Sequence, residues 1–230
     1  MCCRYYIEPQ DAVLEQLGDV AAHTELRKRM YEPIPKPLRT YGEVRPDDIA
    51  PVIATSKRGK KACFPMVWGF NSQNRKLLAN ARSETAGQKP LFQGAWRSHR
   101  CIIPASWYYE WEHYLRPNGK METGEKYLIQ PKGDRITWLC GLYRFEEGFP
   151  HFVILTRAPA EEISFIHDRM PLMVREKDVE EWISPDANPE EIAFRAVTDL
   201  HFEKADNTEK KSGEPYVRAE PLKGHFRDRS

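Results

Sequence analysis

The sequence lacks the features that mark membrane and secreted proteins. No continuous apolar run approaches the length that spans a bilayer. The first residues carry Arg4, Glu8 and Asp11, so they form no apolar signal segment. None of the five cysteines has Cys-x-x-Cys spacing, and no Cys/His cluster resembles a zinc site. These absences favour a reducing cytosol and buried free thiols. The thiols expected to be buried are Cys63, Cys101 and Cys140.

The chain also lacks a large net charge, because its formal total is only +1. Between Lys57 and Arg100, ten basic residues stand against one acid, Glu84, which gives this basic segment +9 and leaves −8 for the remainder. The segment also contains Trp68 and Trp96. Cations that follow phosphates and rings that stack on bases are typical of proteins that bind single-stranded nucleic acid. A solvated basic face explains the charge equally well.

Hydrophobic residues make up 40% of the 230 positions, enough for one domain with a sizeable core. Short β-type runs bounded by Gly, Pro and Asn recur over residues 50–156 and predict an antiparallel sheet or barrel. Apolar spacing and capping residues predict a helix over 11–31 and short helices over 158–168, 176–183 and 188–196. We expect an α+β fold, a single domain with a predominantly antiparallel, β-barrel-like core and peripheral helices. The domain should cover residues 2–203, followed by a polar tail at 204–230.

The opening residues, "MCCRYY", place a cysteine directly after the initiator methionine. Once Met1 is removed, Cys2 carries a free α-amine and a thiol on the same residue. An α-amine has a pKa of about 7.7–8.0, well below that of lysine, so near neutral pH more of it is nucleophilic. The amine can condense with an aldehyde to a Schiff base, and the thiol can then close a thiazolidine ring. Position alone, however, favours a cysteine that merely follows Met1.

Two further stretches carry residue types that chemistry uses. In "NARSET", Asn80 can orient a polar reactant, and Arg82 can hold a phosphate through two parallel hydrogen bonds. The alternative is a polar turn in which Arg82 pairs with Glu84. In "IIPASWYYEW", Glu110 stands among aromatic residues, where burial raises a carboxyl pKa and suits it to general acid/base catalysis. The alternative is an exposed strand glutamate.

The last such stretch is "IHDRMP", which contains His167 and Arg169. A histidine titrates in the physiological range and can transfer a proton, and an arginine can bind phosphate. A capping or core histidine is the favoured alternative when this stretch is taken alone.

In this order, the N-terminal Met-Cys, "NARSET", "IIPASWYYEW" and "HDRMP" resemble the SOS-response-associated peptidase family (SRAP, also called abasic-site processing proteins). The resemblance runs from Cys2 to about Val197, with supporting matches at "YGEVRPDDIAPVI", "WGF", "KPLF" and "CGLYRF". Proteins of this family form a thiazolidine between the mature N-terminal cysteine and the ring-opened aldehyde of an abasic site in single-stranded DNA. The cross-link shields the lesion. The family is also described as removing its own Met1.

The resemblance implies a role for each matching residue. Cys2 would be the nucleophile, through both amine and thiol, and Asn80 would position the reacting centre. Glu110 would be the acid/base that assists sugar opening and cross-link reversal. His167 would transfer a proton to or from the sugar oxygen or the Schiff base. The residues that match DNA-backbone or lesion contacts are Arg4, Arg82, Trp111, Thr156 and Arg169.

The resemblance also implies what the protein works with. The expected partner is single-stranded DNA that contains abasic sites, with no metal, no organic cofactor and no membrane. The enzyme would combine lyase-like Schiff-base chemistry with self-processing peptidase activity. A monomer in the cytoplasm is expected, associated with the nucleoid if the source is bacterial.

The chain departs from the family pattern at three places. Cys3 stands where the family usually has glycine, and it adds a side chain and a second thiol beside Cys2. In "PASWYYEW", Ser106 and Trp107 replace the Asp-Gly of the commoner "PADGFYEW", which puts the local turn and the lesion pocket in question. The polar "NSQNRK" replaces an aromatic-rich segment, so base stacking there should be weaker.

Two other functions fit parts of the pattern. Cys2 would act as a thiol nucleophile on peptides or amides if His167 served as its base. A non-covalent single-strand binder would use the basic segment and leave Cys2 incidental, and its DNA binding would be salt-sensitive and indifferent to the lesion.

Overall fold

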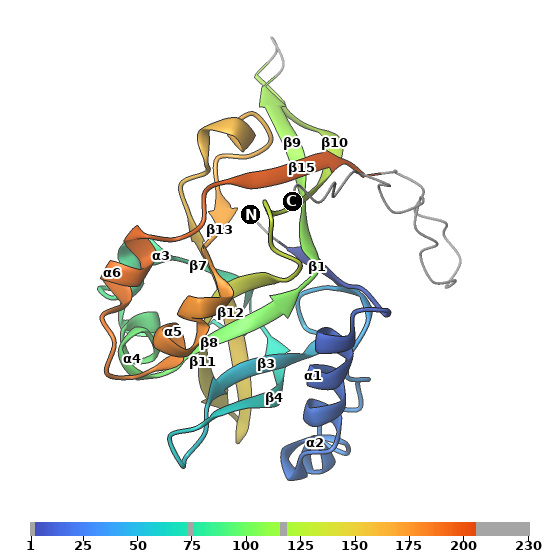
Figure 1. Ribbon diagram of the computed structural model, residues 1–230, viewed down its shortest axis with the longest axis vertical. Helices are drawn as coiled ribbons and strands as arrows, with labels where there is room; N and C mark the ends of the chain where they lie inside the picture. Colours follow the sequence, from blue (N-terminus) through green and yellow to red (C-terminus); the bar gives the residue numbers. More distant parts are fainter. Residues whose placement is uncertain (1–2, 73–75, 116–118, 206–230) are drawn as a thin grey trace, which may run out of the picture.

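Five strands close into a barrel at the centre of the molecule (Figure 1). Their order around the barrel is β12 (Phe149–Arg157), β4 (Lys61–Trp68), β3 (Ile49–Thr55), β8 (Arg100–Ala105) and β11 (Thr137–Glu146), and β11 pairs back with β12. The pairing of β4 with β12 is parallel, and the other four pairings are antiparallel. The computed structural model describes residues 3–72, 76–115 and 119–205. It confirms the predicted α+β domain with a predominantly antiparallel barrel.

A second, five-stranded sheet stands at one end of the barrel (Figure 1). Its strand order is β15 (Leu200–Lys204), β10 (Met121–Pro131), β9 (Trp107–Leu115), β1 (Arg4–Ile7) and β2 (Gly42–Val44). The chain passes from the barrel to this sheet at Ser106, the one residue between β8 and β9. The Ser106 backbone N–H donates to Tyr6 O at 2.8 Å, and its hydroxyl oxygen accepts from the Glu8 N–H at 2.9 Å. Serine thus fixes this turn to β1.

Short elements cover the remaining edges. α1 packs against β3 and β4, α4 and α5 pack against β8, and α3 packs against β12. The helices are α1 (Ala12–Ala22), α2 (Glu25–Met30), α3 (Ser83–Ala86), α4 (Pro90–Ser98), α5 (Val179–Ile183) and α6 (Pro189–Phe194). The short strands are β5 (Phe70–Asn71), β6 (Leu77–Leu78), β7 (Asn80–Arg82), β13 (Met170–Pro171) and β14 (Met173–Val174), and single 3₁₀ turns span Glu161–Ile163 and Glu176–Asp178. No helix in the described ranges is long and apolar enough to cross a membrane.

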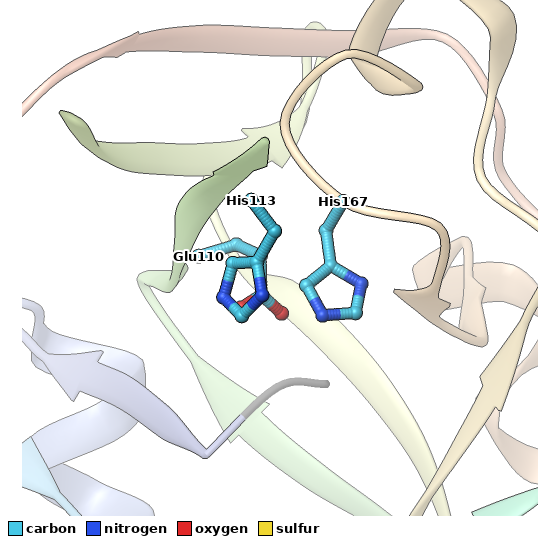
Figure 2. A group of neighbouring side chains, drawn as sticks. All are labelled: Glu110, His113 and His167. Carbon is cyan, nitrogen blue, oxygen red and sulfur yellow. The ribbon is translucent and has the colours of Figure 1, made fainter. Parts of the chain in front are cut away.

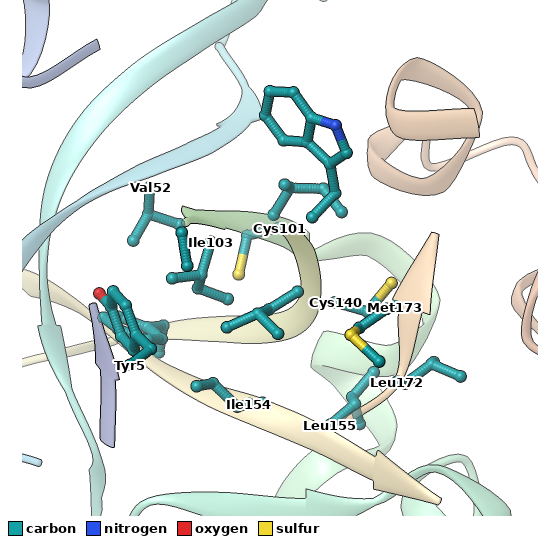
Figure 3. Packing of buried hydrophobic residues seen from close by; sticks show 14 of the residues in the cluster. Tyr5, Val52, Cys101, Ile103, Cys140, Ile154, Leu155, Leu172 and Met173 are labelled. Atoms are coloured by element: carbon teal, nitrogen blue, oxygen red, sulfur yellow. The ribbon is translucent and has the colours of Figure 1, made fainter. Parts of the chain in front are cut away.

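The barrel interior is filled by aliphatic, aromatic and sulfur-containing side chains (Figure 3). Cys63, Cys101 and Cys140 are buried free thiols, as predicted. Burial raises the pKa of Cys63 to about 12 and those of Cys101 and Cys140 well above the ordinary value of a thiol. These three thiols are therefore packing groups, because the thiolate is the reactive form of cysteine.

The predicted helix over 11–31 is two helices. Asp11 caps α1, where its carboxylate accepts from the backbone N–H groups of Val13 and Leu14. Thr24 has an extended backbone, and its hydroxyl accepts from the Arg27 N–H as the N-cap of α2. A threonine hydroxyl that accepts a hydrogen bond from a free N–H stabilises the start of a helix. The second helix therefore begins at this point.

The predicted helix over 158–168 is wrong, because only Glu161–Ile163 forms a 3₁₀ turn. The reason lies in the strands at its ends: Arg157 of β12 pairs directly with Met170 of β13. An 11-residue helix would separate its ends by about 16 Å, whereas antiparallel partners lie about 5 Å apart. The segment must therefore fold back as a loop, which we call the histidine loop (residues 158–169).

The elements that were not predicted are the helices α3 and α4 and the strands β1, β2, β6, β7, β13, β14 and β15. β15 pairs with β10 up to the pair formed by Tyr127 and Lys204. The expected tail at 204–230 falls almost entirely outside the described residues, which end at 205.

Candidate active site

Glu110 occupies the middle of β9 and is almost fully buried, with 4% of its surface exposed. Alternate residues of a strand share a face, so Glu110 points to the same side as the buried Tyr108, and Trp111 points to the other. Burial raises the pKa of the Glu110 carboxyl above its ordinary value, as the aromatic surroundings predicted. The alternative of an exposed strand glutamate is wrong.

His167, at the end of the histidine loop, lies beside Glu110. Figure 2 shows the side chains of Glu110, His113 and His167 converging on one point, and their ligand-type N and O atoms all lie within 4.8 Å of one another. The rings of His113 and His167 meet edge to face, with centroids 4.8 Å apart. The His113 backbone N–H donates to Ile166 O at 3.1 Å and so ties β9 to the loop. Glu110 and His167, which the sequence singled out separately, thus lie together, and His113 lies beside them.

The protonation of His167 differs from the expectation of a group that titrates near neutrality. Burial, reinforced by repulsion from His113, lowers the pKa of His167 to about 4, although Asp168 opposes the shift. The ring is therefore neutral at pH 7. Its Nδ1 lies 2.7 Å from Asp168 Oδ1 and 3.0 Å from the Arg169 backbone N. A proton on Nδ1 can be donated to Asp168, whereas an unprotonated Nδ1 accepts from Arg169, so the two tautomers have different partners.

Strand β1 pairs with β9 beside Glu110. Arg4 pairs with Tyr109, the neighbour of Glu110 on β9. The Arg4 guanidinium lies 5.0 Å from the ring centre of Trp111, and its Nη1 lies 3.2 Å from Glu43 Oε1. Cys2 lies outside the described residues. Cys3 is exposed as a residue, yet desolvation of its sulfur and the nearby Glu110 carboxylate raise the pKa of its thiol.

Asn80 and Arg82 lie on β7, which pairs in parallel with β12 and places Arg82 beside Thr156. Arg82 is exposed. Thr156 is fully buried, and its hydroxyl donates to Ala81 O at 3.4 Å. Its side chain therefore holds β7 and β12 together instead of facing solvent.

Arg169 is engaged within the protein. Its two terminal nitrogens each lie 2.8 Å from one carboxylate oxygen of Glu84, and Nη2 also donates to Thr156 O at 2.7 Å. The predicted alternative paired Glu84 with Arg82, but Glu84 pairs with Arg169. This ion pair joins α3 to the histidine loop.

Within the described residues, the basic segment does not form one surface. The side chain of Arg100 is buried, and its guanidinium donates to five backbone carbonyls. Trp68 and Trp96 are also buried, with their indole N–H groups bonded to Ala79 O and Glu190, so neither ring is available to stack on a base. The basic hairpin between β3 and β4 projects at the end of the molecule away from β9 (Figure 1).

Trp107, the departure expected to alter the lesion pocket, lies on the opposite face of β9 from Glu110. Its ring stacks on Tyr6 at a centroid distance of 4.7 Å and meets Tyr109 edge to face. Together with Trp111 and Leu128, these side chains form a cluster separate from the barrel core. Trp107 thus packs β9 against β1, away from the carboxylate.

The sequence and the fold are similar to those of known proteins. The model of the SOS response associated peptidase (SRAP) family matches residues 1–209. The abasic site processing protein YoqW of Bacillus subtilis (strain 168) is 35% identical over 123 residues, which cover 51% of this chain and 53% of that protein, about half its length. The abasic site processing protein YedK of Escherichia coli (strain K12) is 28% identical over 171 residues, which cover 69% of this chain and 71% of that protein.

Solved structures show the same fold. A crystal structure of a protein from Bacteroides thetaiotaomicron superposes with a TM-score of 0.66 at 21% identity, covering 90% of this chain and 93% of that chain. Identity this low shows the fold alone, whereas the family model spans nearly the whole sequence. The chain therefore belongs to the SOS response associated peptidase (SRAP) family.

Proposed function

We propose that this protein processes abasic sites in single-stranded DNA by forming a covalent cross-link through Cys2. The observation that carries the proposal is the pairing of Arg4 with Tyr109, beside the buried Glu110 and the partly buried His167. Consecutive Cα atoms are about 3.8 Å apart, so chain connectivity alone keeps the Cys2 Cα within about 7.6 Å of the Arg4 Cα. An N-terminal aminothiol is thus tethered next to two groups that can exchange protons.

The proposed reaction has two steps once Met1 has been removed. The α-amine of Cys2 attacks the aldehyde carbon of the ring-opened deoxyribose, and loss of one water leaves a Schiff base. The Cys2 sulfur then adds to the imine carbon while the nitrogen takes up a proton, which closes the thiazolidine. The adduct has the combined mass of protein and DNA less one water. No oxidant, reductant or metal is consumed.

Glu110 and His167 would supply the proton transfers. A carboxyl with a raised pKa is partly protonated closer to neutrality than an ordinary glutamate, so it can donate to the sugar oxygen during ring opening and take the proton back. His167, neutral at pH 7, can accept a proton from the attacking amine or thiol. Asn80 would orient the sugar.

The DNA backbone would be held by the cations around this site. We propose that Arg4, Arg82 and Arg169 face phosphates and that Trp111, with Arg4 over its ring, packs near the lesion. Arg169 would have to share its guanidinium between Glu84 and a phosphate. Thr156, being buried, would contribute by positioning Arg169 through its carbonyl oxygen.

The test is intact mass spectrometry of the purified protein before and after incubation with a single-stranded oligonucleotide that carries one abasic site. We expect loss of Met1 and an adduct of the summed masses less one water. Cys2→Ala should form no thiazolidine adduct. Cys3→Ser is the matched control, because it removes the adjacent exposed thiol and should still form the adduct.

Other results would point to the alternative functions. An adduct that persists in Cys2→Ala would assign the Schiff base to a lysine and overturn the thiazolidine. Salt-sensitive binding that is equal with and without the lesion, with no adduct, would indicate a non-covalent binder. Turnover of a peptide other than the Met1–Cys2 bond would indicate a thiol hydrolase.

A further inference from the structure

His113 has no part in the proposed cross-linking reaction, yet its ring meets that of His167 above the Glu110 carboxylate (Figure 2). Two imidazoles and one carboxylate converge here, with their ligand atoms within 4.8 Å of one another. We propose that Glu110, His113 and His167 bind a divalent transition-metal ion, Zn²⁺ by preference, and that the bound ion blocks cross-linking.

The donor set suits zinc. Two histidines and one glutamate are a known three-ligand zinc set, which leaves the fourth position open to water. Zn–N bonds of about 2.0–2.1 Å place the ligand atoms of a tetrahedral ion roughly 3.3–3.5 Å apart. The present spacing is wider by an amount that side-chain rotation can close. His113 is the exposed member of the three and is therefore free to rotate.

The surroundings of the histidines support the same assignment. Zinc-bound histidines usually donate their other ring N–H to a carboxylate or carbonyl, which fixes the ring. Asp168 Oδ1 lies 2.7 Å from His167 Nδ1, so this carboxylate can hold the ring with Nε2 available to a metal. The hydrogen bond from the His113 N–H to Ile166 O fixes the two ligand-bearing segments relative to each other. The His167 ring and the His113 backbone are thus held by contacts other than the one between the two rings, while the His113 side chain can still rotate toward an ion.

Zinc in this position would inhibit the protein. Glu110 and His167 could no longer exchange protons while they ligate a cation, because a ligand's lone pair is engaged by the metal. This part of the inference rests on the proposed function, whereas metal binding itself does not. The expected absence of a metal cofactor is unaffected, because the ion would act as a reversible inhibitor.

The first experiment measures Zn²⁺ binding by calorimetry on the metal-free, full-length protein without DNA. His113→Gln should weaken this binding by at least about tenfold, and Asp168→Asn by about tenfold. His23→Gln, which removes an exposed histidine at the end of α1, should leave it unchanged. Cys2 and the histidine-containing tail are identical in all these proteins, so equal zinc affinity in wild type and His113→Gln would overturn the site.

The second experiment measures adduct formation in chelator-treated buffer and with added Zn²⁺. Wild type should cross-link without zinc and slow at least about tenfold when zinc is saturating, whereas His113→Gln should cross-link in both conditions. Zinc binding through His113 without inhibition would overturn the blocking role. Failure of the proposed function is recognised separately, because no adduct would then form even in chelator-treated buffer.

Discussion

Glu110 and His167 meet at the end of β1, and burial acts on the ionisation of each by disfavouring its charged form. The pKa of the Glu110 carboxyl is therefore raised, and that of His167 falls to about 4 from an ordinary 6.5. Between pH 4 and pH 6.5, His167 is therefore protonated in the unfolded chain and neutral in the folded protein. Stability associated with His167 is thus fully present above pH 6.5 and is lost as the pH falls toward 4.

We expect wild type to lose more stability than His167→Gln when the pH is lowered from 7 to 4.5. The lowering of the His167 pKa to about 4 corresponds to at most about 3 kcal/mol at pH 4.5, and solvent screening at the partly exposed ring reduces the expected difference to the order of 1 kcal/mol. Thermal unfolding of both proteins in metal-free buffer at the two pH values measures this difference in stability loss. Carboxylates shared by the two proteins cancel in the comparison. Parallel losses in the two proteins would contradict the lowered pKa.

At the residue scale, local chemistry was predictable and long-range partners were not. The aromatic neighbours of Glu110 in "SWYYEW" indicated a buried carboxyl, although they left an exposed strand glutamate open as the alternative. His113, three residues later, gave no signal of its own, because its partner is 54 positions away in the histidine loop. Arg100 was counted with a DNA-binding charge, but its five donors meet five carbonyls that only the folded chain brings together.

At the element scale, the ion pair between Glu84 and Arg169 fixes the histidine loop to α3. Arg169→Lys keeps the charge but loses the planar fork that holds both carboxylate oxygens and Thr156 O. We expect a loss of about 1–2 kcal/mol in the free energy of unfolding and faster hydrogen exchange in residues 158–169.

The matched control for this prediction is Lys28→Gln, which breaks an ion pair with Glu25 whose two side chains are 68% and 83% exposed. That pair is worth only about 0.3–0.5 kcal/mol. Chemical denaturation and exchange mass spectrometry compare the two variants. Equal, small losses in both would show that the Arg169 fork does not hold the loop.

The unpredicted elements differ in how much signal their sequences carry. α4 carries a readable signal, since Pro90 occupies the first helical position and Phe92, Ala95 and Trp96 have helical spacing. The sequence of β15 carries a weaker signal, because the burial of its residues alternates weakly. It is a strand because it pairs with β10. The loop that replaces the predicted helix over 158–168 is imposed by the pairing of β12 with β13, which no local propensity reveals.

At the scale of the whole molecule, the barrel depends on strands that are far apart in the sequence. Alternating apolar runs predicted the strands, but closure requires β12 to pair with both β11 and β4, and the latter is about eighty residues earlier and parallel. Gly141 lies in β11, between β8 and β12. In the strand pairing it stands opposite Cys101 on one side and Ile154 on the other.

We expect Gly141→Ala to destabilise the whole barrel. A Cβ at this position would lie 2.6 Å from Ile103 Cδ1, 2.7 Å from the Val153 backbone oxygen and 3.0 Å from the Cys101 sulfur. Because the oxygen belongs to a paired strand, the clash cannot be relieved by a side-chain rotation. Overpacking of this kind costs about 1–3 kcal/mol, or about 2–4 °C of melting temperature per kcal/mol in a protein of this size.

Gly94→Ala is the control that separates crowding from the general effect of replacing glycine. Gly94 is exposed within α4, and a Cβ there meets nothing within 4 Å. Alanine favours a helix interior over glycine by about 0.5–1 kcal/mol, so this variant should melt at the same temperature or higher. The measurement is thermal unfolding of both variants. An unchanged melting temperature in Gly141→Ala would show that a Cβ fits between β8 and β12, and it would contradict the predicted crowding at this position.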